Sequence, residues 1–236
     1  MVYDLILDKG KSEKVAVLID PDKNDNISVQ RTLEICSKCN IDFILVGGSL
    51  VSVPIDELVG EIKKNSSVPV ILFPGSLLQI SEKADAILLL SLISGRNPEY
   101  LIGNHVIAAP MLKKIKIETI PTGYMLIESG KFTTVQYISN TTPIPFEKTD
   151  IAVATAIAGE MLGLKTIYLE AGSGALQNVP EKMISAIKRN ISIPIIVGGG
   201  IRSKNQLEKT FKAGADIIVI GNSLENKPEK LYEILK

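Results

Sequence analysis

Eight short apolar runs, each closed by a turn signal, constrain the fold of this chain more than any other feature. Most of them are continuously apolar rather than alternating, which is typical of parallel strands buried on both faces. β-Branched residues and Leu dominate the runs, so each one predicts a strand. The predicted strands are Val15–Asp20, Phe43–Gly48, Pro69–Phe73, Ala86–Ser91, Glu118–Met125, Thr166–Ala171, Pro194–Gly198 and Ile217–Gly221.

Helical patterns fill most gaps between these runs, which indicates repeated β-α units and a parallel sheet. The predicted helices are Asn26–Cys39, Pro54–Asn65, Phe146–Leu162, Val179–Arg189, Ser203–Ala213 and Lys227–Lys236. An eight-fold β/α barrel typically needs about 250 residues, so 236 residues favour one closed α/β barrel domain over residues 1–236. Two gaps depart from the repeat. Pro74–Asp85 is short for a crossover helix, and Leu126–Phe146 is a long polar segment, which is typical of functional loops.

Charge and apolar content exclude several classes of protein. Lys plus Arg equals Asp plus Glu at 26 each, which argues against nucleic acid as a main partner. No apolar run approaches the roughly 20 residues of a membrane span, and no basic start precedes an apolar stretch. We therefore expect a cytoplasmic protein without a transmembrane segment. Cys36 and Cys39 are spaced like half a zinc site, but His105 is the only His, so two small apolar helix residues are favoured.

Three glycine-bearing turns follow the last three predicted strands. They lie at Gly172-Ser173-Gly174, Gly198-Gly199-Gly200 and Gly221-Asn222. In such a barrel the carboxyl ends of the strands face the active site. Glycine lets backbone N–H groups approach an anion closely, and converging N–H groups form a phosphate cradle. The turns therefore predict a phosphate-binding site.

Other polar residues at predicted strand ends leave two interpretations open. Asp20, Asp22 and Ser49 offer hard oxygen ligands for Mg²⁺, whereas Asp-Pro-Asp also forms ordinary turns. Glu170 is either a base near a bound phosphate or a cap of the next turn, and Tyr168 either contacts a ligand or packs. The remaining candidates are His105 as a general base or a packed side chain, Arg96 as a diphosphate contact, and Lys113, Lys114 and Lys116 as a solvated helix end.

Taken in chain order, these motifs resemble the geranylgeranylglyceryl phosphate synthase family over nearly the whole chain. The Tyr-Leu-Glu-x-x-Ser-Gly element is the most specific part, because the glycine turns alone fit many phosphate-binding barrels. The motifs are Leu18-Ile19-Asp20-Pro21-Asp22-Lys23, Gly47-Gly48-Ser49, Phe73-Pro74-Gly75-Ser76, Tyr124-Met125-Leu126-Ile127, Tyr168-Leu169-Glu170-Ala171-Gly172-Ser173-Gly174, Val197-Gly198-Gly199-Gly200-Ile201-Arg202 and Gly221-Asn222.

The resemblance implies a single modified TIM (β/α)8 barrel with an irregular third β/α unit, in agreement with the short Pro74–Asp85 gap. It also implies a prenyltransferase. The 3-hydroxyl of sn-glycerol 1-phosphate attacks C1 of a polyprenyl diphosphate, with geranylgeranyl as the expected chain, and an ether lipid precursor and pyrophosphate are formed. Mg²⁺ assists the departure of pyrophosphate. The form of the first motif is similar to a second family branch, whose members are often homo-oligomers.

By position, the resemblance assigns a role to each motif residue. Asp20 and Ser49 are the implied Mg²⁺ ligands, and Glu170 is the implied catalytic residue that orients the attacking hydroxyl. Leu18 stands where some bacterial relatives have a Lys that contacts glycerol phosphate, so that contact is missing here. The implied substrate-binding residues are Tyr168, Leu169, Glu170, Ala171, Gly172, Ser173, Gly174, Gly199, Gly200, Gly221 and Asn222.

Two alternatives stand beside this prediction. One is a phosphosugar isomerase, epimerase or lyase on the same kind of barrel, and the other is a non-catalytic protein that binds a phosphate ligand. The discriminating feature is a long apolar channel leading away from the glycine turns, because only a prenyl substrate requires one.

Overall fold

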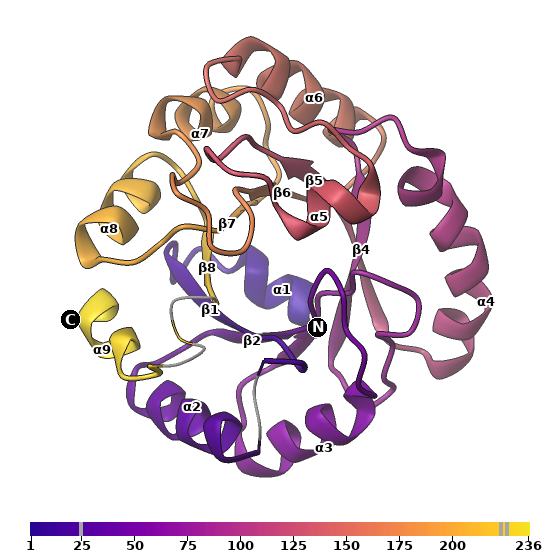
Figure 1. Cartoon of the computed structure of the whole chain (residues 1–236), viewed down its shortest axis with the longest axis vertical. Coiled ribbons are helices and arrows are strands. Elements are labelled where there is room, and N and C mark those ends of the chain that lie inside the picture. The colour runs from indigo at the N-terminus through magenta and orange to yellow at the C-terminus, as the bar shows by residue number, and fades with distance from the viewer. Residues whose placement is uncertain (24–25, 222–223, 225–226) are drawn as a thin grey trace.

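Eight parallel strands close into a barrel in the computed structural model, which describes residues 1–23, 26–221, 224 and 227–236 (Figure 1). Each strand pairs with its sequence neighbours, and β1 pairs with β8 to close the ring. The strands are β1 Lys14–Ile19, β2 Phe43–Val46, β3 Val70–Leu72, β4 Ala86–Leu92, β5 Glu118–Leu126, β6 Thr166–Glu170, β7 Ile195–Gly198 and β8 Ile217–Ile220.

A ring of helices surrounds the strands. Its members are α2 Asn26–Lys38, α3 Ile55–Asn65, α4 Asn104–Ile115 with the preceding π-helix η1 Glu99–Gly103, α6 Thr149–Met161, α7 Glu181–Lys188, α8 Lys204–Lys212 and α9 Lys230–Leu235. Two short helices, α1 Val2–Leu7 and α5 Thr134–Ser139, are not part of this ring and appear inside it in the view of Figure 1. Among the described residues, none of these helices is long and apolar enough to cross a membrane.

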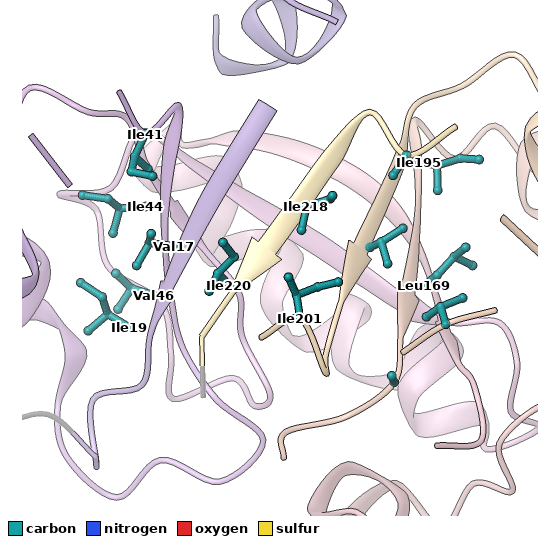
Figure 2. Packing of buried hydrophobic residues seen from close by; sticks show 14 of the residues in the cluster. Val17, Ile19, Ile41, Ile44, Val46, Leu169, Ile195, Ile201, Ile218 and Ile220 are labelled. Atoms are coloured by element: carbon teal, nitrogen blue, oxygen red, sulfur yellow. The ribbon is translucent and has the colours of Figure 1, made fainter. Parts of the chain in front are cut away.

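The continuous apolar runs form two layers of core. On β1, Val17 and Ile19 pack outward against the helices, whereas Ala16 lies inside the barrel. Figure 2 shows the outer layer, with side chains of β1, β2 and β8 side by side. Successive side chains of a strand point to opposite faces, so a strand with apolar neighbours on both faces has few polar positions. This explains why the strands are visible in the sequence.

The N-terminal end of the barrel is closed by α1. Val2 and Ile6 are buried with the residues of the barrel interior. The carboxylate of Glu118, the first residue of β5, accepts the backbone N–H groups of Val2 at 2.5 Å and Tyr3 at 3.0 Å. These N–H groups have no partner within the helix, so Glu118 fixes the helix in place. The opposite end of the barrel remains open for a site.

The eight predicted strands are confirmed, each to within two residues of its predicted ends. The irregular third unit is confirmed as well, because no helix forms between β3 and β4 in residues 73–85, all of which are described. Six predicted helices are present, although α6, α7 and α9 begin two to three residues later than expected.

Three helices were not predicted: α1, α5 and α4 with its π-helical start. Ile102 on η1 and Val106 and Ile107 on α4 are exposed, and Pro110 lies inside α4. The apolar residues therefore do not follow the period of a helix with one buried face. Lys113, Lys114 and Lys116 end this helix in solvent, as expected.

Candidate active site

A polar cavity of about 340 Å³ lies at the carboxyl ends of the strands. It brings together residues that are separated by up to about two hundred positions in the chain, and most of the predicted site residues are among them. The predicted residues that line it are Asp20, Ser49, Tyr168, Glu170, Gly172, Ser173, Gly174, Gly199, Gly200 and Gly221.

Three predicted binding residues do not line this cavity in the described structure. Leu169 and Ala171 alternate with Tyr168 and Glu170, so their side chains are buried in the outer layer against the helices. Only their backbone belongs to the site. Asn222 lies outside the described residues.

The first two glycine turns require glycine for steric reasons. Gly172, Gly199 and Gly200 have φ of +96°, +87° and +78°, which other residues rarely adopt. A Cβ on Gly199 would lie 2.8 Å from both the Gly172 nitrogen and Oε1 of Glu170. The two turns are therefore packed directly against each other, with the Gly172 N–H bonded to Glu170.

Glu170 is a buried carboxylate at the centre of this arrangement. It ends β6 with 7% of its surface exposed, and its Oε1 accepts the N–H of Gly172 at 2.6 Å. Burial raises the pKa of Glu170 to about 7, and the Gly172 N–H and the nearby Tyr168 hydroxyl partly offset this rise. Burial disfavours the charged form of an acid. A carboxyl group with this pKa can accept a proton at neutral pH.

Three aromatic rings form the floor of the cavity. Tyr168 is fully buried and stacks on Phe73 with ring centroids 5.0 Å apart, and Tyr124 lies 5.4 Å from Tyr168. Burial raises the pKa of both tyrosines well above its usual range, and the charge of Glu170 adds to this effect. Both hydroxyls therefore remain protonated. The buried Tyr168 hydroxyl lies close enough to the Glu170 carboxylate to lower the pKa of that carboxyl group.

Asp20 and Asp22 have different environments. The Asp20 carboxylate lines the polar cavity, with 15% of the side chain exposed and Nζ of Lys23 at 3.3 Å. Asp22 instead accepts the N–H and hydroxyl of Ser52 and the N–H of Val53, at 2.9 to 3.2 Å. These bonds, first of all that from the Ser52 N–H, lower the pKa of Asp22. Asp22 therefore organises a loop, and Asp20 is the carboxylate that faces the site.

Lys23 is a site residue to which the sequence analysis gave no role. Its Nζ lies 3.3 Å from Asp20 and 3.4 Å from the Ser173 hydroxyl, so it spans the cavity between the first strand end and a glycine turn. Arg202 also lines the cavity and donates to the Ala175 carbonyl at 2.6 Å. The signal for Lys23 was its place three residues after Asp20 in a strand-end loop. Both residues supply positive charge next to the predicted phosphate cradle.

The oxygen atoms of this cavity fit Mg²⁺ bound together with a substrate. Among the described residues, no three His, Cys, Asp or Glu side chains gather into a metal site, so the protein alone supplies too few ligands. Mg²⁺ keeps several waters and typically takes one or two carboxylates plus substrate phosphates. Asp20 and the Ser49 hydroxyl, both on the cavity wall, match that requirement.

An apolar groove of about 110 Å³ adjoins the polar cavity. The two share Gly48, Ser49, Phe73, Tyr124 and Val135, so they meet over the carboxyl ends of β2 and β3. From there the groove is walled by β4, η1, α4 and α5. The apolar side chains that line it include Leu88, Leu90, Leu92, Tyr100, Ala108, Leu112 and Ile138.

The other candidates lie away from the polar cavity. His105 is on the wall of the apolar groove, its Nε2 lies 3.1 Å from the Ser91 hydroxyl, and burial lowers its pKa. It is placed to pack rather than to act as a base at the glycine turns. Arg96 lines neither cavity and donates to the Gly95 carbonyl at 2.7 Å. Cys36 and Cys39 carry free thiols on and beside α2, and burial raises the pKa of Cys36 to about 12.

Comparison with known proteins gives the same result from sequence and from structure. Residues 9–236 match the PcrB family. Geranylgeranylglyceryl phosphate synthase of Spirosoma linguale is 53% identical over 220 residues, which are 93% of this chain and 88% of that protein. The Pyrococcus furiosus protein of the same name is 47% identical over 212 residues, or 89% of this chain and 84% of that protein.

A solved structure covers the whole chain. It is (S)-3-O-geranylgeranylglyceryl phosphate synthase of Thermoplasma acidophilum in complex with its substrate sn-glycerol 1-phosphate, and it superposes with a TM-score of 0.93 at 35% identity. The alignment covers 100% of this chain and 96% of that chain.

Proposed function

Because the chain belongs to the PcrB family, we propose that it joins a polyprenyl diphosphate to the 3-hydroxyl of sn-glycerol 1-phosphate. The single observation that carries this proposal is the meeting of two cavities of opposite character. A polar cavity with glycine turns adjoins an apolar groove, and they share the ends of β2 and β3. The relatives named for this activity support it, as does the related structure with sn-glycerol 1-phosphate.

The two substrates fit the two cavities by their chemistry. The phosphate of glycerol phosphate suits the N–H groups of the turns at residues 172–174 and 199–200, as helix and turn N–H groups favour anions. The prenyl chain suits the groove along β4 and α4, where burial of apolar surface supplies binding energy. The diphosphate then lies at the shared wall, near Gly48 and Ser49. This places the reacting carbon between the groove and Glu170.

The residues of the chain supply binding and proton transfer. The 3-hydroxyl oxygen forms the new bond to C1 of the prenyl group, while the bond from C1 to the diphosphate oxygen breaks and its electron pair leaves with pyrophosphate. The hydroxyl proton goes to the Glu170 carboxylate. Its pKa of about 7 lies near the operating pH, where a general base is most effective. The Gly172 N–H holds that carboxylate in position.

We further propose that Asp20 and Ser49 hold Mg²⁺ in this cavity. Bound there, the ion would neutralise the charge that develops on the departing pyrophosphate. Lys23 lies beside Asp20 and would add positive charge on the same side. Removing divalent cations with a chelator should abolish turnover, and adding Mg²⁺ should restore it. Full activity in the chelated enzyme would contradict the metal proposal and leave the transferase proposal intact.

The alternatives are less consistent with the site. A phosphosugar isomerase, epimerase or lyase, and likewise a simple phosphate-binding protein, does not require a groove lined by apolar residues of β4 and α4.

The exposed apolar side chains of η1 and α4 support the prediction of a homo-oligomer, since contiguous exposed apolar residues often mark interfaces. They are Ile102, Val106, Ile107 and Met111. Light scattering after size exclusion measures the oligomeric state. A cytoplasmic location stays a prediction from the sequence.

A direct assay tests the function. The protein is mixed with Mg²⁺, labelled sn-glycerol 1-phosphate and prenyl diphosphates of several lengths, and the organic phase is analysed for labelled ether lipid. We expect product with geranylgeranyl diphosphate or with a prenyl diphosphate of similar length. Labelled glycerol phosphate that stays in water with every prenyl length, while the protein binds it, would identify a binding protein instead.

A further inference from the structure

Gln79 joins the turns that follow β2 and β3. It belongs to the irregular segment between β3 and β4 and is 1% exposed. Its Oε1 accepts the backbone N–H groups of Gly48 at 3.1 Å and Gly75 at 3.3 Å, and its Nε2 donates to the Gly48 carbonyl at 2.8 Å. Only this orientation of the amide satisfies all three backbone groups.

The turns around Gln79 are packed backbone against backbone. A Cβ on Gly75 would lie 2.3 Å from the Gly48 carbonyl oxygen, and a Cβ on Gly47 would lie 2.0 Å from the Phe73 carbonyl oxygen. Residues 47 and 75 therefore have no room for a side chain of their own. The amide of Gln79 provides the polar side-chain contacts between the turns. A buried N–H or C=O group without such a partner is costly. The turns are therefore held in one arrangement by one side chain.

This arrangement determines the positions of Gly48 and Ser49 in the wall that the two cavities share. Gly48 is packed against the carboxylate of Asp20, since a Cβ there would lie 3.0 Å from Oδ2. Gly48 and Ser49 line both the polar cavity and the apolar groove. Gln79 itself lines neither cavity. A shift of the Gly48 backbone would thus move Ser49 relative to Asp20 without changing the glycine turns at residues 172–174 and 199–200.

We propose that Gln79 is a positioning residue for the diphosphate end of the prenyl substrate. Through Gly48 it sets the distance between Ser49 and Asp20 at the wall where the diphosphate lies. The inference rests on the proposed function for the identity of the ligand. It also explains why the segment between β3 and β4 contains no helix. This irregular segment stays close to the strand ends and brings the buried amide of Gln79 next to them, whereas a regular crossover helix would lead the chain away from the strand ends. The glycerol phosphate side of the site does not depend on Gln79.

The test compares Gln79→Met with Ser81→Ala. Met keeps the approximate shape and removes all three hydrogen bonds. Ser81 is buried in the same segment, but its hydroxyl donates to Asp56 on α3 at 2.6 Å, so Ser81→Ala loosens the segment away from the turns. Calorimetry measures two dissociation constants in separate titrations, that of inorganic pyrophosphate with Mg²⁺ and that of sn-glycerol 1-phosphate. Steady-state assays measure the KM of the prenyl diphosphate. Thermal unfolding shows whether each variant is folded.

In Gln79→Met, we expect the Kd of pyrophosphate with Mg²⁺ and the KM of the prenyl diphosphate to rise about 10–100-fold, as is typical when a residue behind a metal site is lost. The Kd of glycerol phosphate should stay within about twofold, and Ser81→Ala should change neither ligand beyond about twofold. Equal weakening of both ligands in Gln79→Met, or the same selective loss in Ser81→Ala, would overturn the inference. So would unchanged pyrophosphate binding.

A second variant applies if Gln79→Met does not fold. Gln79→Glu keeps the shape and the two acceptor contacts and loses the donor to the Gly48 carbonyl. It should show a smaller loss that is still selective for pyrophosphate, and equal effects on both ligands would again overturn the inference. A parent protein that binds both ligands but makes no ether lipid would contradict the proposed function alone. The pyrophosphate titrations would still decide the role of Gln79.

Discussion

At the residue scale, the buried carboxylate of Glu170 connects stability with reactivity. It ends β6 at the wall of the polar cavity, where burial raises its pKa from an ordinary 4.5 to about 7. The same burial makes the ionised form unfavourable in the folded protein. The raised pKa has two results. Glu170 is a base that is partly protonated at neutral pH, and the folded protein is less stable at high pH.

Replacing Glu170 with Gln should lower kcat far more than it weakens glycerol phosphate binding. We propose that backbone N–H groups of the turns hold the phosphate, and Gln leaves these groups in place. Gln cannot take the hydroxyl proton, so we expect kcat to fall by about 10²–10⁴-fold while the Kd stays within about threefold. Steady-state kinetics and calorimetry measure the two quantities. Weak binding with an unchanged maximal rate would make Glu170 a binding residue only.

The pH dependence of stability should also change in Glu170→Gln. A raised pKa in the folded state means that the stabilising protonated form is fully present below about pH 4.5 and is lost as the pH rises through about 7. The parent should therefore be less stable than the variant at pH 8, by on the order of 1–3 kcal/mol. The difference should vanish near pH 4. Urea unfolding of both proteins at several pH values measures it, and a constant difference would contradict the shifted pKa.

Asp20→Asn should remove turnover and leave the fold intact. In the proposed mechanism the charged carboxylate holds Mg²⁺ against a diphosphate, and a metal ion in that role supplies several kcal/mol, so we expect a loss of about 100-fold or more in kcat. Asp22→Asn is the matched control, because that carboxylate accepts N–H groups of residues 52 and 53 instead of lining the cavity. Similar activity losses in both variants at saturating Mg²⁺ would return Asp20 to the role of a turn residue.

At the element scale, α4 has two different apolar faces. Ala108 and Leu112 face the barrel and line the groove beside β4, whereas Val106 and Ile107 near the start of α4 are exposed. A helix of this kind shows no single apolar stripe, which is why the sequence did not predict it. The small side chain of Ala108 leaves space in the groove where we propose that the prenyl chain binds.

Ala108→Phe should narrow the groove and shorten the prenyl chain that the enzyme accepts. The larger side chain overpacks the position, so the KM of geranylgeranyl diphosphate should rise about 10–100-fold, equivalent to roughly 1.4–2.8 kcal/mol. Shorter prenyl diphosphates and glycerol phosphate should be affected less. Ala109→Phe is the control, because Ala109 is exposed on the next position of the same helix. An unchanged preference for chain length in Ala108→Phe would place the prenyl chain elsewhere.

At the scale of the whole molecule, the same set of hydrogen bonds recurs at three places around the N-terminal end of the barrel. Asp42, Asp85 and Asp216 directly precede β2, β4 and β8. Each carboxylate accepts an N–H at or next to the start of the preceding strand at 2.8 Å, from Val15, Val70 and Ile195 respectively. The backbone N–H of each Asp donates to the carbonyl of that same Val or Ile at 2.9 Å. Lys11, Lys63 and Lys188 pair with the three carboxylates. These contacts join neighbouring strands at the point where their backbone hydrogen bonding begins.

Asp216→Ala should destabilise the barrel without affecting catalysis. It leaves the N–H of Ile195 without its partner, which costs about 1–3 kcal/mol. Lys188→Ala removes only the partly exposed ion pair and should cost about 0–1 kcal/mol. Urea unfolding measures both, and kcat per folded molecule should match that of the parent. A larger effect of Lys188→Ala than of Asp216→Ala would show that the ion pair, rather than the backbone bond, is the main contribution.

The sequence by itself determined the number, order and approximate ends of the strands, because strands buried on both faces need unbroken apolar runs. It also placed the glycine turns, Asp20, Ser49 and Glu170 at strand ends, and closure of the barrel brought these ends into one cavity. The sequence analysis expected Leu169 and Ala171 to bind substrate, whereas strand alternation places both side chains in the outer layer.

Tertiary structure alone decided the rest. The bridging position of Lys23, the separation of Asp22 from Asp20, the course of the apolar groove along α4, and the contacts of Gln79 with two turns all depend on segments far apart in the chain. Local sequence records the period and polarity of one segment, and carries no measure of its distance from another. The raised pKa of Glu170 has the same origin, because burial by neighbouring strands and turns exists only once the barrel is closed.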